Sequence, residues 1–469
     1  MEIEFSAHEF REDENFYLTR YKYQGDESSG WKIYREGELF ETLGKGYLLL
    51  KTRYCGICST DIARANLPFK LPQIIGHELV VSLDEKNYVV EINASHKARG
   101  VKNTSCFYCN NEMDIHCQER LTLGIDRLPG GFSPYVLVPR NSLIPIPPNI
   151  SAINASITEP FAAAYHAVTT SVTKAHSSVA VVGPRRLGSL LLLALKLYRK
   201  KQNFDFTITA VIRNETLNDF CIKSGADDVA NVLEITDQKY DLVFDTTGSE
   251  SGFLQSLKIA GKILHVKSTN GKPVEGLTRL TEMVIDELSL AAVTGSKRNT
   301  LYQSIEDDSV REVVLDEAIP KDLLVALIKS FPEKIFSRLN MNNDINGSHS
   351  NDKHYDLAIV SNVHQLNHVV RNSEGKSLVR AKSKILWYKD DGVRVTGELE
   401  DALFVRNVQL HTSRCGSFKY ALKMMAENTL DFEAFCDTFI SEVRDIAELH
   451  EAFEEAKNER GKIKIVMRH

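Results

Sequence analysis

The sequence predicts an α/β protein in which an all-β domain comes before a doubly wound domain with a parallel sheet. Three observations predict this class. From residue 16 to about residue 150, short apolar runs are separated by Gly and Pro, as is typical of strands and turns. After Ile157, continuous apolar runs alternate with helical segments, which is typical of parallel strands covered by helices on both faces. A polar segment then divides the second part, and the chain beyond it resembles the chain before it.

In the first part, the clearest strands are GYLLLKTRY (46–54) and YVLVP (135–139), and no long amphipathic helix is evident. The second part begins with the helical segment EPFAAAYHAVTTSV, and we place the boundary near residue 170. The alternating elements that follow are a strand at 177–183, a helix at 187–200, a strand at 206–212, a helix at 214–224 and a strand at 241–247. An amphipathic helix and the short strand KIKIVM (462–467) end the chain.

The polar segment MNNDINGSHSNDKH (341–354) is rich in Asn, Ser, Gly and Asp and predicts a flexible loop. Three pairs of segments are repeated around it: YDL at Tyr240 and Tyr355, KIL at Lys262 and Lys384, and VIDELSL at Val284 with VRNVQLH at Val405. Either a strand–helix–strand unit is partly duplicated, or any two such units look alike.

Length and charge limit the function classes. The 469 residues suggest two or three domains. A formal net charge of −6 argues against general nucleic-acid binding. The longest apolar stretch, 187–198, is too short to span a bilayer and contains Lys196. The acidic N-terminus is neither a signal nor a transit peptide. We therefore expect a cytoplasmic protein that binds neither nucleic acid nor membranes.

Five of the eight cysteines lie in two clusters within the first 120 residues. In a reducing compartment, clustered cysteines more often bind a metal or do chemistry than form disulfides. The first cluster, YCGICSTD, is followed by GHE and later by the pair Glu159-Pro160. Thiolate, imidazole and carboxylate are the ligand types of a catalytic zinc site, which has three protein ligands and one open position. Thr60, two residues after Cys58, is placed to pass a substrate proton to solvent.

Together and in this order, the motifs resemble those of the zinc-dependent medium-chain alcohol dehydrogenases, particularly the polyol and threonine dehydrogenase branch. The resemblance covers about 17–270 and 395–469 and includes GICSTD, GHE, GGFSPYVLVP (130–139) and EPFAAAYHA (159–167). It implies a GroES-like β domain and a Rossmann nucleotide-binding domain. It also implies a set of catalytic and zinc-binding residues: Cys58, Thr60, His77, Glu78 and Glu159.

Within this set, the resemblance makes Cys58 and His77 zinc ligands and Thr60 the proton relay. Glu159 takes the third ligand position, and Glu78 either binds directly or exchanges with it. The position three residues after Thr60, often a relay histidine in the alcohol branch, is Ala63 here, which weakens an assignment to simple alcohols.

The second cluster, Cys106, Cys109 and Cys117, matches a lobe that in this family holds a structural zinc with four cysteines. The first of the four positions is Asn103 here. A structural zinc site normally has four protein ligands. We expect a retained three-cysteine site completed by another residue, with Asp114 and His116 nearby, or else a relic lobe with free thiols.

The turn GPRRLG follows a strand and opens a helix, where a dinucleotide fold places its phosphate-binding glycines. Gly183 can still form the tight turn, and Gly188 can still allow close contact between helix and strand. The position of the middle glycine is occupied by Arg185. Its side chain must swing away or meet phosphate itself. The expected cofactor-binding residues are Gly183, Arg185, Arg186, Leu187, Gly188 and Arg213, and the family resemblance adds Thr247 and Gly248, which follow a later strand and would line the cofactor cleft.

Arg213 decides the choice of cofactor. An NAD site has an acid at the end of the second strand, where this chain has Ile212 followed by Arg213. An arginine there suits a 2′-phosphate, so we expect NADP rather than NAD. The alternative is that Arg213 is a solvated residue at a strand end.

The expected function is a zinc-dependent transfer of a hydride between NAD(P) and an alcohol, sugar, polyol or related hydroxy or carbonyl compound. One alternative is a degenerate, non-catalytic member of the fold that binds or regulates. Another is a zinc-free quinone reductase. The expected domains are 1–169, with 446–469 returning to it, and 170–445, with an insertion at about 271–394. Folds of this family commonly associate through the Rossmann sheet edge, which would give a homodimer or homotetramer.

Overall fold

The computed structural model describes residues 1–235, 239–296, 298–339, 354–459 and 461–469, and its chain divides into two compact units. Unit 1 comprises Met1–His166, Arg185–Leu197 and Cys415–His469, and unit 2 comprises Ala167–Pro184 and Tyr198–Arg414. Unit 1 therefore takes up the C-terminal chain from Cys415, earlier than the expected return near residue 446. The flexible loop expected at 341–354 lies, except for His354, outside the described residues.

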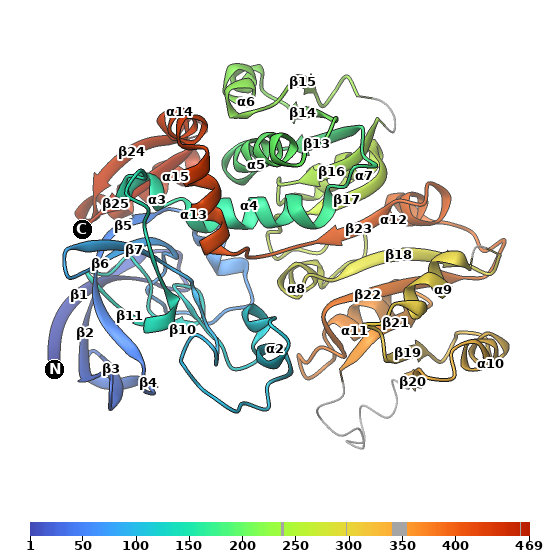
Figure 1. Ribbon diagram of the computed structural model, residues 1–469, viewed down its shortest axis with the longest axis horizontal. Coiled ribbons are helices and arrows are strands. Elements are labelled where there is room, and N and C mark those ends of the chain that lie inside the picture. Colours follow the sequence, from blue (N-terminus) through green and yellow to red (C-terminus); the bar gives the residue numbers. More distant parts are fainter. Residues whose placement is uncertain (236–238, 297, 340–353, 460) are drawn as a thin grey trace. The chain divides into compact units, whose positions relative to one another are not determined.

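Unit 1 is built on three sheets, which confirms the predicted β domain (Figure 1). The first sheet has the order β1 (Glu2–Phe10), β2 (Phe16–Asp26), β3 (Gly30–Arg35), β4 (Glu38–Leu43). The second has the order β12 (Leu143–Pro145), β7 (Lys86–Val90), β6 (Glu78–Leu83), β5 (Tyr47–Gly56), β25 (Lys464–Arg468), β24 (Ile440–Asp445), with β11 (Tyr135–Pro139) also paired to β5. The third has the order β10 (Arg127–Leu128), β9 (Leu121–Leu123), β8 (Asn93–Ala94).

Strand β5 positions the first cysteine cluster. It pairs with β6, β11 and β25, so backbone hydrogen bonds to three other strands fix its position. It ends at Gly56, two residues before Cys58. Strand β6 begins immediately after His77, and Gly56 lies opposite Glu78 in the β5–β6 register. Two motifs that are separated in the sequence are thus brought together by one antiparallel strand pair.

The helices of unit 1 are mostly short, and the 14-residue helix α4 begins in unit 1 and ends in unit 2. Their bounds are α1 (Ser59–Ile62), α2 (Phe107–Asn110), α3 (Ala152–Ala155), α4 (Thr158–Ser171), α13 (Phe418–Glu427), α14 (Thr429–Phe439) and α15 (Leu449–Asn458). Helix α5 (Arg186–Gln202) also begins in unit 1 and ends in unit 2. The expected helices at 159–172 and 187–200 are therefore α4 and α5.

Unit 2 is built on one 11-stranded sheet. Six of its strands lie in the order β15 (Asp228–Asn231), β14 (Thr207–Ile212), β13 (Ser178–Val182), β16 (Tyr240–Asp245), β17 (Ala260–Val266), β23 (Gln409–Thr412), all parallel. This is the doubly wound order of a dinucleotide-binding fold. The predicted Rossmann topology is confirmed, and the strands expected at 177–183, 206–212 and 241–247 are β13, β14 and β16.

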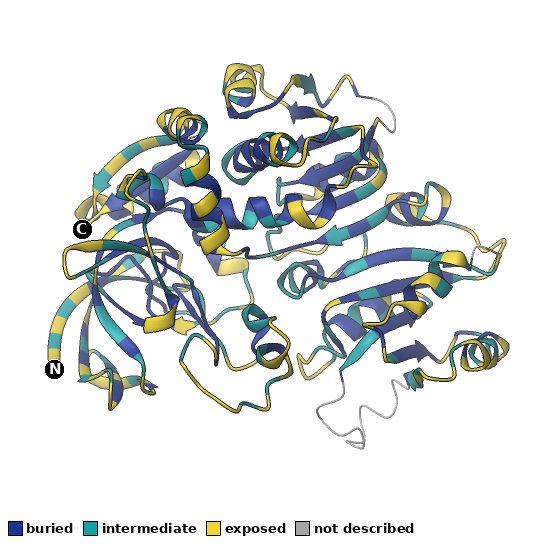
Figure 2. Ribbon diagram, in the orientation of Figure 1, coloured by how far each residue is buried: buried dark blue, intermediate teal, exposed yellow. Residues whose placement is uncertain are grey.

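The insertion expected at about 271–394 extends this sheet beyond β23. Its strands continue the order with β18 (Ser289–Thr294), β22 (Val379–Lys389), β21 (Tyr355–Val360), β19 (Glu312–Asp316), β20 (Ile335–Leu339). The helices of unit 2 are α6 (Asn218–Ser224), α7 (Glu250–Ile259), α8 (Leu280–Ile285), α9 (Asn299–Glu306), α10 (Lys321–Ser330), α11 (Val363–Val370) and α12 (Gly397–Glu400). Figure 2 shows that the middle strands of this sheet are buried, as continuous apolar runs predict.

Candidate functional site

Cys58 is the N-cap of α1, and the turn around it is held by its own side chains. The Cys58 sulfur accepts a hydrogen bond from the Thr60 backbone N–H at 3.5 Å. The Cys58 N–H donates to Asp61 Oδ2 at 2.8 Å, which completes a capping box. Because α1 begins here, the Cys58 thiol lies at a fixed position at the end of β5.

Asp61 also orients His77. The carboxylate is almost fully buried, and its Oδ1 lies 3.4 Å from His77 Nδ1 and accepts from the Gly76 N–H at 3.3 Å. This leaves His77 Nε2 as the ring nitrogen for a metal, because a carboxylate on one imidazole nitrogen fixes the ring for coordination by the other. Gly76 has φ +94°, and a Cβ there would lie 2.8 Å from Cys55 Sγ, so the turn before His77 requires glycine. Sequence reasoning did not assign Asp61 a role.

Glu78 is fully buried and forms an ion pair that the sequence did not predict. Its Oε2 accepts from Lys464 Nζ at 2.5 Å, and the same ammonium donates to the Ile57 carbonyl at 3.0 Å. Lys464 lies on β25, beside β5, and its side chain is 2% exposed. The other carboxylate oxygen, Glu78 Oε1, is buried and has no hydrogen-bond partner among the residues that the structure describes.

Glu159 and Thr60 complete the expected catalytic set. Glu159 lies in the first turn of α4 and Thr60 in α1, both partly buried. Within the described residues, only the second cluster brings the ligand atoms of three or more His, Cys, Asp or Glu side chains within 4.8 Å of one another. The structure brings Cys58, His77 and Glu78 to the ends of adjacent strands, and their gathering with Glu159 around one ion stays a prediction.

In the structure, His96 lies with the three cysteines of the second cluster, which the sequence did not predict. Cys106, Cys109, Cys117 and His96 form the group whose ligand atoms lie within 4.8 Å of one another. His96 Nδ1 is 3.3 Å from Cys117 Sγ and 3.7 Å from Cys109 Sγ. Three thiols and one imidazole are a set that binds structural zinc.

The surroundings of His96 fit a metal ligand. Its Nε2 lies 3.0 Å from Glu119 Oε2, so one ring nitrogen faces a carboxylate and the other faces the thiols. Burial raises the pKa of the Cys106 thiol, but hydrogen bonds from the backbone of Cys109 and Gln118 and from the side chains of His96 and Cys109 together outweigh it and lower that pKa to about 7. A thiol that ionises readily is the form that binds metal.

The two residues named from sequence as completing this lobe lie outside the group. Asp114 Oδ2 instead accepts from Ser95 Oγ at 3.4 Å, and His116 is buried against the Tyr108 ring. The sequence did not predict His96 as a ligand. It lies after β8, ten residues before Cys106, and this spacing matches no known pattern of metal ligands.

In unit 2, the phosphate-binding turn keeps the features that need glycine. Gly183 has φ +78°, and a Cβ there would lie 2.8 Å from Thr247 Cγ2. Thr246 Oγ1 donates to the Gly183 carbonyl at 2.8 Å, and Thr247 donates its N–H and O–H to Asp245 Oδ1 at 2.9 and 2.7 Å. Burial raises the pKa of Asp245 to about 6. The carboxyl ends of β13 and β16 are thus fastened together.

The other residues expected to bind the cofactor lie at these strand ends or in α5. Gly248 has φ +59°, Gly188 is buried in α5, and Leu187 is half-buried beside it. Arg213, exposed at the end of β14, donates to Ser251 Oγ at 3.0 Å. The structure therefore places Arg213 where the sequence predicted it, after the second strand of the fold.

Arg185 and Arg186 are bound to the C-terminal chain of unit 1. Arg185 Nη2 donates to the carbonyls of Glu459 and Lys462, at 2.6 and 3.1 Å. Arg186 donates to the carbonyls of Ile463 and Ala456. Of the two alternatives for Arg185, this arrangement favours the one in which its side chain swings away, and a phosphate would compete with these bonds.

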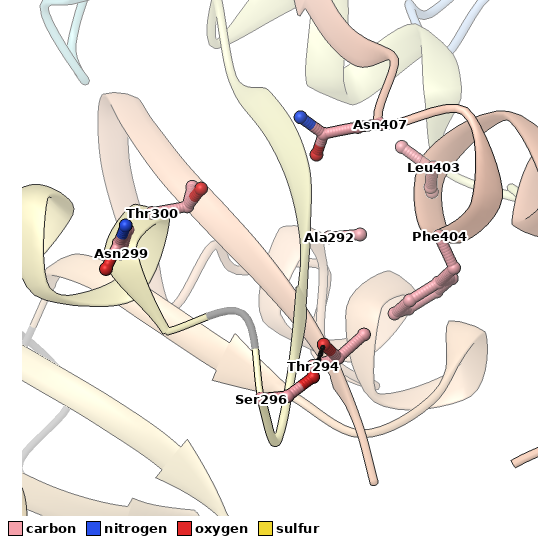
Figure 3. A pocket seen from close by; sticks show the side chains of 8 residues that line it. All are labelled: Ala292, Thr294, Ser296, Asn299, Thr300, Leu403, Phe404 and Asn407. Atoms are coloured by element: carbon pink, nitrogen blue, oxygen red, sulfur yellow. Dashed lines mark hydrogen bonds between the residues drawn. The ribbon is translucent and has the colours of Figure 1, made fainter. Parts of the chain in front are cut away.

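A cavity of about 310 Å³ lies beside β18 in unit 2. Figure 3 shows side chains from β18, from the start of α9 and from the chain before β23 around it; they are Ala292, Thr294, Ser296, Asn299, Thr300, Leu403, Phe404 and Asn407. None of the residues predicted from sequence lines it. In the part of the chain that the structure describes, no helix is long and apolar enough to cross a membrane.

Comparisons with known proteins agree with the fold described above. The model of the alcohol dehydrogenase GroES-like domain matches residues 44–148. An L-threonine 3-dehydrogenase of Bacillus licheniformis is 29% identical over 291 residues, which cover 56% of this chain and 80% of that protein. A sorbitol dehydrogenase of Halalkalibacterium halodurans is 30% identical over 158 residues, covering 32% and 45% of the two chains. The structure of L-idonate 5-dehydrogenase from Escherichia coli aligns over 100% of this chain and 99% of its own with a TM-score of 0.55 and 13% identity, which shows a shared fold.

Proposed function

Since the chain belongs to the medium-chain dehydrogenase/reductase family, we propose that it is a zinc-dependent oxidoreductase. It transfers a hydride between NADP and an alcohol, sugar, polyol or related hydroxy compound. The threonine and sorbitol dehydrogenases among its relatives support a substrate of the hydroxy amino acid or polyol type.

The observation that carries the proposal is the buried Oε1 of the Glu78 carboxylate, which has no hydrogen-bond partner in the described part of the chain. An unsatisfied buried oxygen is costly, and where one is found in a native protein it is explained by local strain, a catalytic role, or a bound water or ion. It lies next in sequence to His77, whose ring Asp61 orients, and opposite the end of β5 that leads into Cys58. Cys58, His77 and Glu159, with Glu78 as an alternative oxygen donor, are the residues that would hold the zinc.

A zinc held by these residues would act as a Lewis acid toward the oxygen of the substrate. The chain's own groups do the rest. Asp61 keeps the His77 ring in place, and Thr60 presents a hydroxyl two residues from Cys58 that can take the substrate proton toward solvent. Lys464 neutralises one oxygen of Glu78, so the buried site carries less negative charge than its residue types suggest.

The proposal of NADP rests on the end of β14. Ile212 ends that strand and Arg213 follows it, so no acid is present there to accept from a ribose 2′-hydroxyl. Among the described residues, the Arg213 guanidinium donates to the hydroxyl of Ser251. A guanidinium can also pair with a phosphate through two N–H groups. The variant Arg213→Ala is therefore expected to weaken NADP binding by at least about tenfold and to leave NAD binding unchanged. Equal weakening of both cofactors would contradict the assignment.

The test of the enzyme itself is a screen of polyols, sugars and hydroxy amino acids with NADP and with NAD, with zinc content measured on the same sample. Cys58→Ser is expected to abolish turnover while NADPH binding persists. Cys436→Ser, a buried thiol in α14, is the matched control and is expected to keep activity. Full activity in Cys58→Ser would refute the catalytic assignment.

One observation favours the second candidate, a non-catalytic member of the fold. Arg185 and Arg186, at the phosphate-binding turn, are bound to main-chain carbonyls of the C-terminal segment. Metal analysis together with NADPH fluorescence separates the candidates: zinc with cofactor binding supports the enzyme, cofactor without zinc a quinone reductase, and neither a binding module.

We also propose that His96, Cys106, Cys109 and Cys117 hold a second, structural zinc. Support comes from their grouping and from the carboxylate of Glu119 behind His96. Four protein ligands leave no open position, so this site would stabilise the lobe without taking part in the reaction.

A further inference from the structure

The 11-stranded sheet of unit 2 has a mirrored strand order. Outward from β23, the order is β17, β16, β13, β14; outward from β18, it is β22, β21, β19, β20. The repeated segments of the sequence lie at matching places, with YDL at the start of β16 and β21 and KIL within β17 and β22. The repetition expected from sequence therefore extends to the topology.

The two halves meet at one antiparallel junction. Every other strand pair in this sheet is parallel, whereas β18 pairs with β23 in antiparallel fashion at Leu290 and Leu410 (Figure 1). Both leucines are buried, and a single apolar core contains residues from both halves. Thr412 Oγ1 donates to the carbonyls of Met283 and Leu288, at 3.0 and 2.7 Å, and so fastens the end of β23 to the chain before β18.

Without the inserted strands, β23 would be the edge of a six-stranded sheet. An open edge offers unpaired N–H and C=O groups to another strand, and two identical sheets can join there only in antiparallel fashion about a two-fold axis. The junction between β18 and β23 has this arrangement, but both strands belong to one chain.

The inserted half does not keep a phosphate-binding turn. At the end of β19, which corresponds to β13, the turn reads DEAIP and contains no glycine. The buried Asp316 carboxylate accepts from the backbone N–H groups of Ala318 and Ser361 at this turn. Arg338 Nη1 donates to the carbonyls of Asp316 and Ile319, at 2.8 and 2.7 Å. The place of a phosphate is therefore filled by the chain itself.

We infer that strands β18–β22 act as a built-in partner. They cover the edge of β23 through which two copies of the chain would otherwise join, and they bind no nucleotide themselves. The chain therefore does not associate through this sheet edge, in contrast to the homodimer or homotetramer expected from the family resemblance. The inference depends on strand pairing and not on the proposed activity.

Disulfide trapping in the full chain tests this inference. In Leu290→Cys/Leu410→Cys, the two cysteines are partners across an antiparallel pair, and such partners have Cα atoms about 4.5–5.5 Å apart, within the range that a disulfide spans. After mild oxidation, peptide mapping is expected to find the 290–410 bond within one chain, and Leu410→Cys alone is expected to form no 410–410 bond between chains. A 410–410 bond, a 290–410 bond between two chains, or a folded double variant without the bond would overturn the inference.

Hydrogen exchange of the unchanged chain gives a second readout in case the variants fail to fold. The backbone amides of Gln409–Thr412 are expected to stay equally protected over about a hundredfold dilution, because an intramolecular cover does not respond to mass action. Protection that falls with dilution would show that another copy covers the edge.

Discussion

The buried pair between Lys464 and Glu78 allows a quantitative test by Lys464→Met. The change removes the ammonium but keeps most of the side-chain volume, so the main effect is an unpaired buried carboxylate. Both side chains are almost fully buried, at 2% and 0% exposure, and the Ile57 carbonyl loses its donor as well. Breaking one partner of a buried ion pair costs about 3–5 kcal/mol. At a urea dependence of roughly 1–3 kcal/mol per molar, the unfolding midpoint of unit 1 is expected to fall by at least about 1 M.

The assay follows unit 1 by itself. The chain has two tryptophans, Trp31 in unit 1 and Trp387 in unit 2, so the Trp387→Phe background leaves Trp31 as the only indole. Urea unfolding is measured in metal-free protein, so that bound zinc does not mask the lost charge. Glu78→Gln/Lys464→Met is the matched control, and it is expected to recover most of the loss because it removes both charges. A loss in Lys464→Met below about 1 kcal/mol, the value for an exposed pair, would refute the reasoning.

Three other predictions concern the metal lobe and the carboxyl end of β16. His96→Asn is expected to lower the zinc content by one equivalent per chain, whereas His116→Asn keeps it; equal zinc in both would contradict the assigned ligand. Glu119→Gln is expected to weaken zinc binding to the lobe by roughly 10–100-fold in a chelator competition. The raised pKa of Asp245, about 6 against a usual 3.8, means that its stabilising contribution is full below pH 4 and is lost as pH rises through 6. Asp245→Asn, which keeps an oxygen for Thr247, is therefore expected to gain stability relative to the parent between pH 4 and pH 7, by up to about 3 kcal/mol in urea unfolding; a difference that does not vary with pH would contradict it.

The features that the sequence predicts best are those set by residues close together in the chain, namely strands, helices and short motifs. The apolar runs of β13, β14 and β16 and the periodicity of α5 predict these elements to within a few residues, because burial on both faces or on one face imposes a fixed spacing. The motifs around Cys58 and His77 were likewise readable as short strings.

What could not be predicted depends on contacts between distant segments. Lys464 reaches Glu78 across 386 positions of sequence, and no spacing rule joins them. His96 enters the cysteine lobe because the chain after β8 turns toward it, and its residue type fits many other environments. The sequence shows that Arg185 replaces the middle glycine of the phosphate-binding turn. The partners of its side chain, the carbonyls of Glu459 and Lys462, follow only from the tertiary structure.

The pairing of β5 with β25 also sets the order in which the site can form. Cys55 lies opposite Met467, so a strand near the start of the chain needs one near residue 468. Contacts between residues so far apart form late, because the loop between them must be closed first. During synthesis, the strand that leads into Cys58 can therefore complete its pairing only after residue 468 has been made. Glu78 receives its counter-charge only when Lys464 pairs with it, so the residues proposed to hold the catalytic zinc reach their final arrangement only after β25 has joined β5 in the sheet.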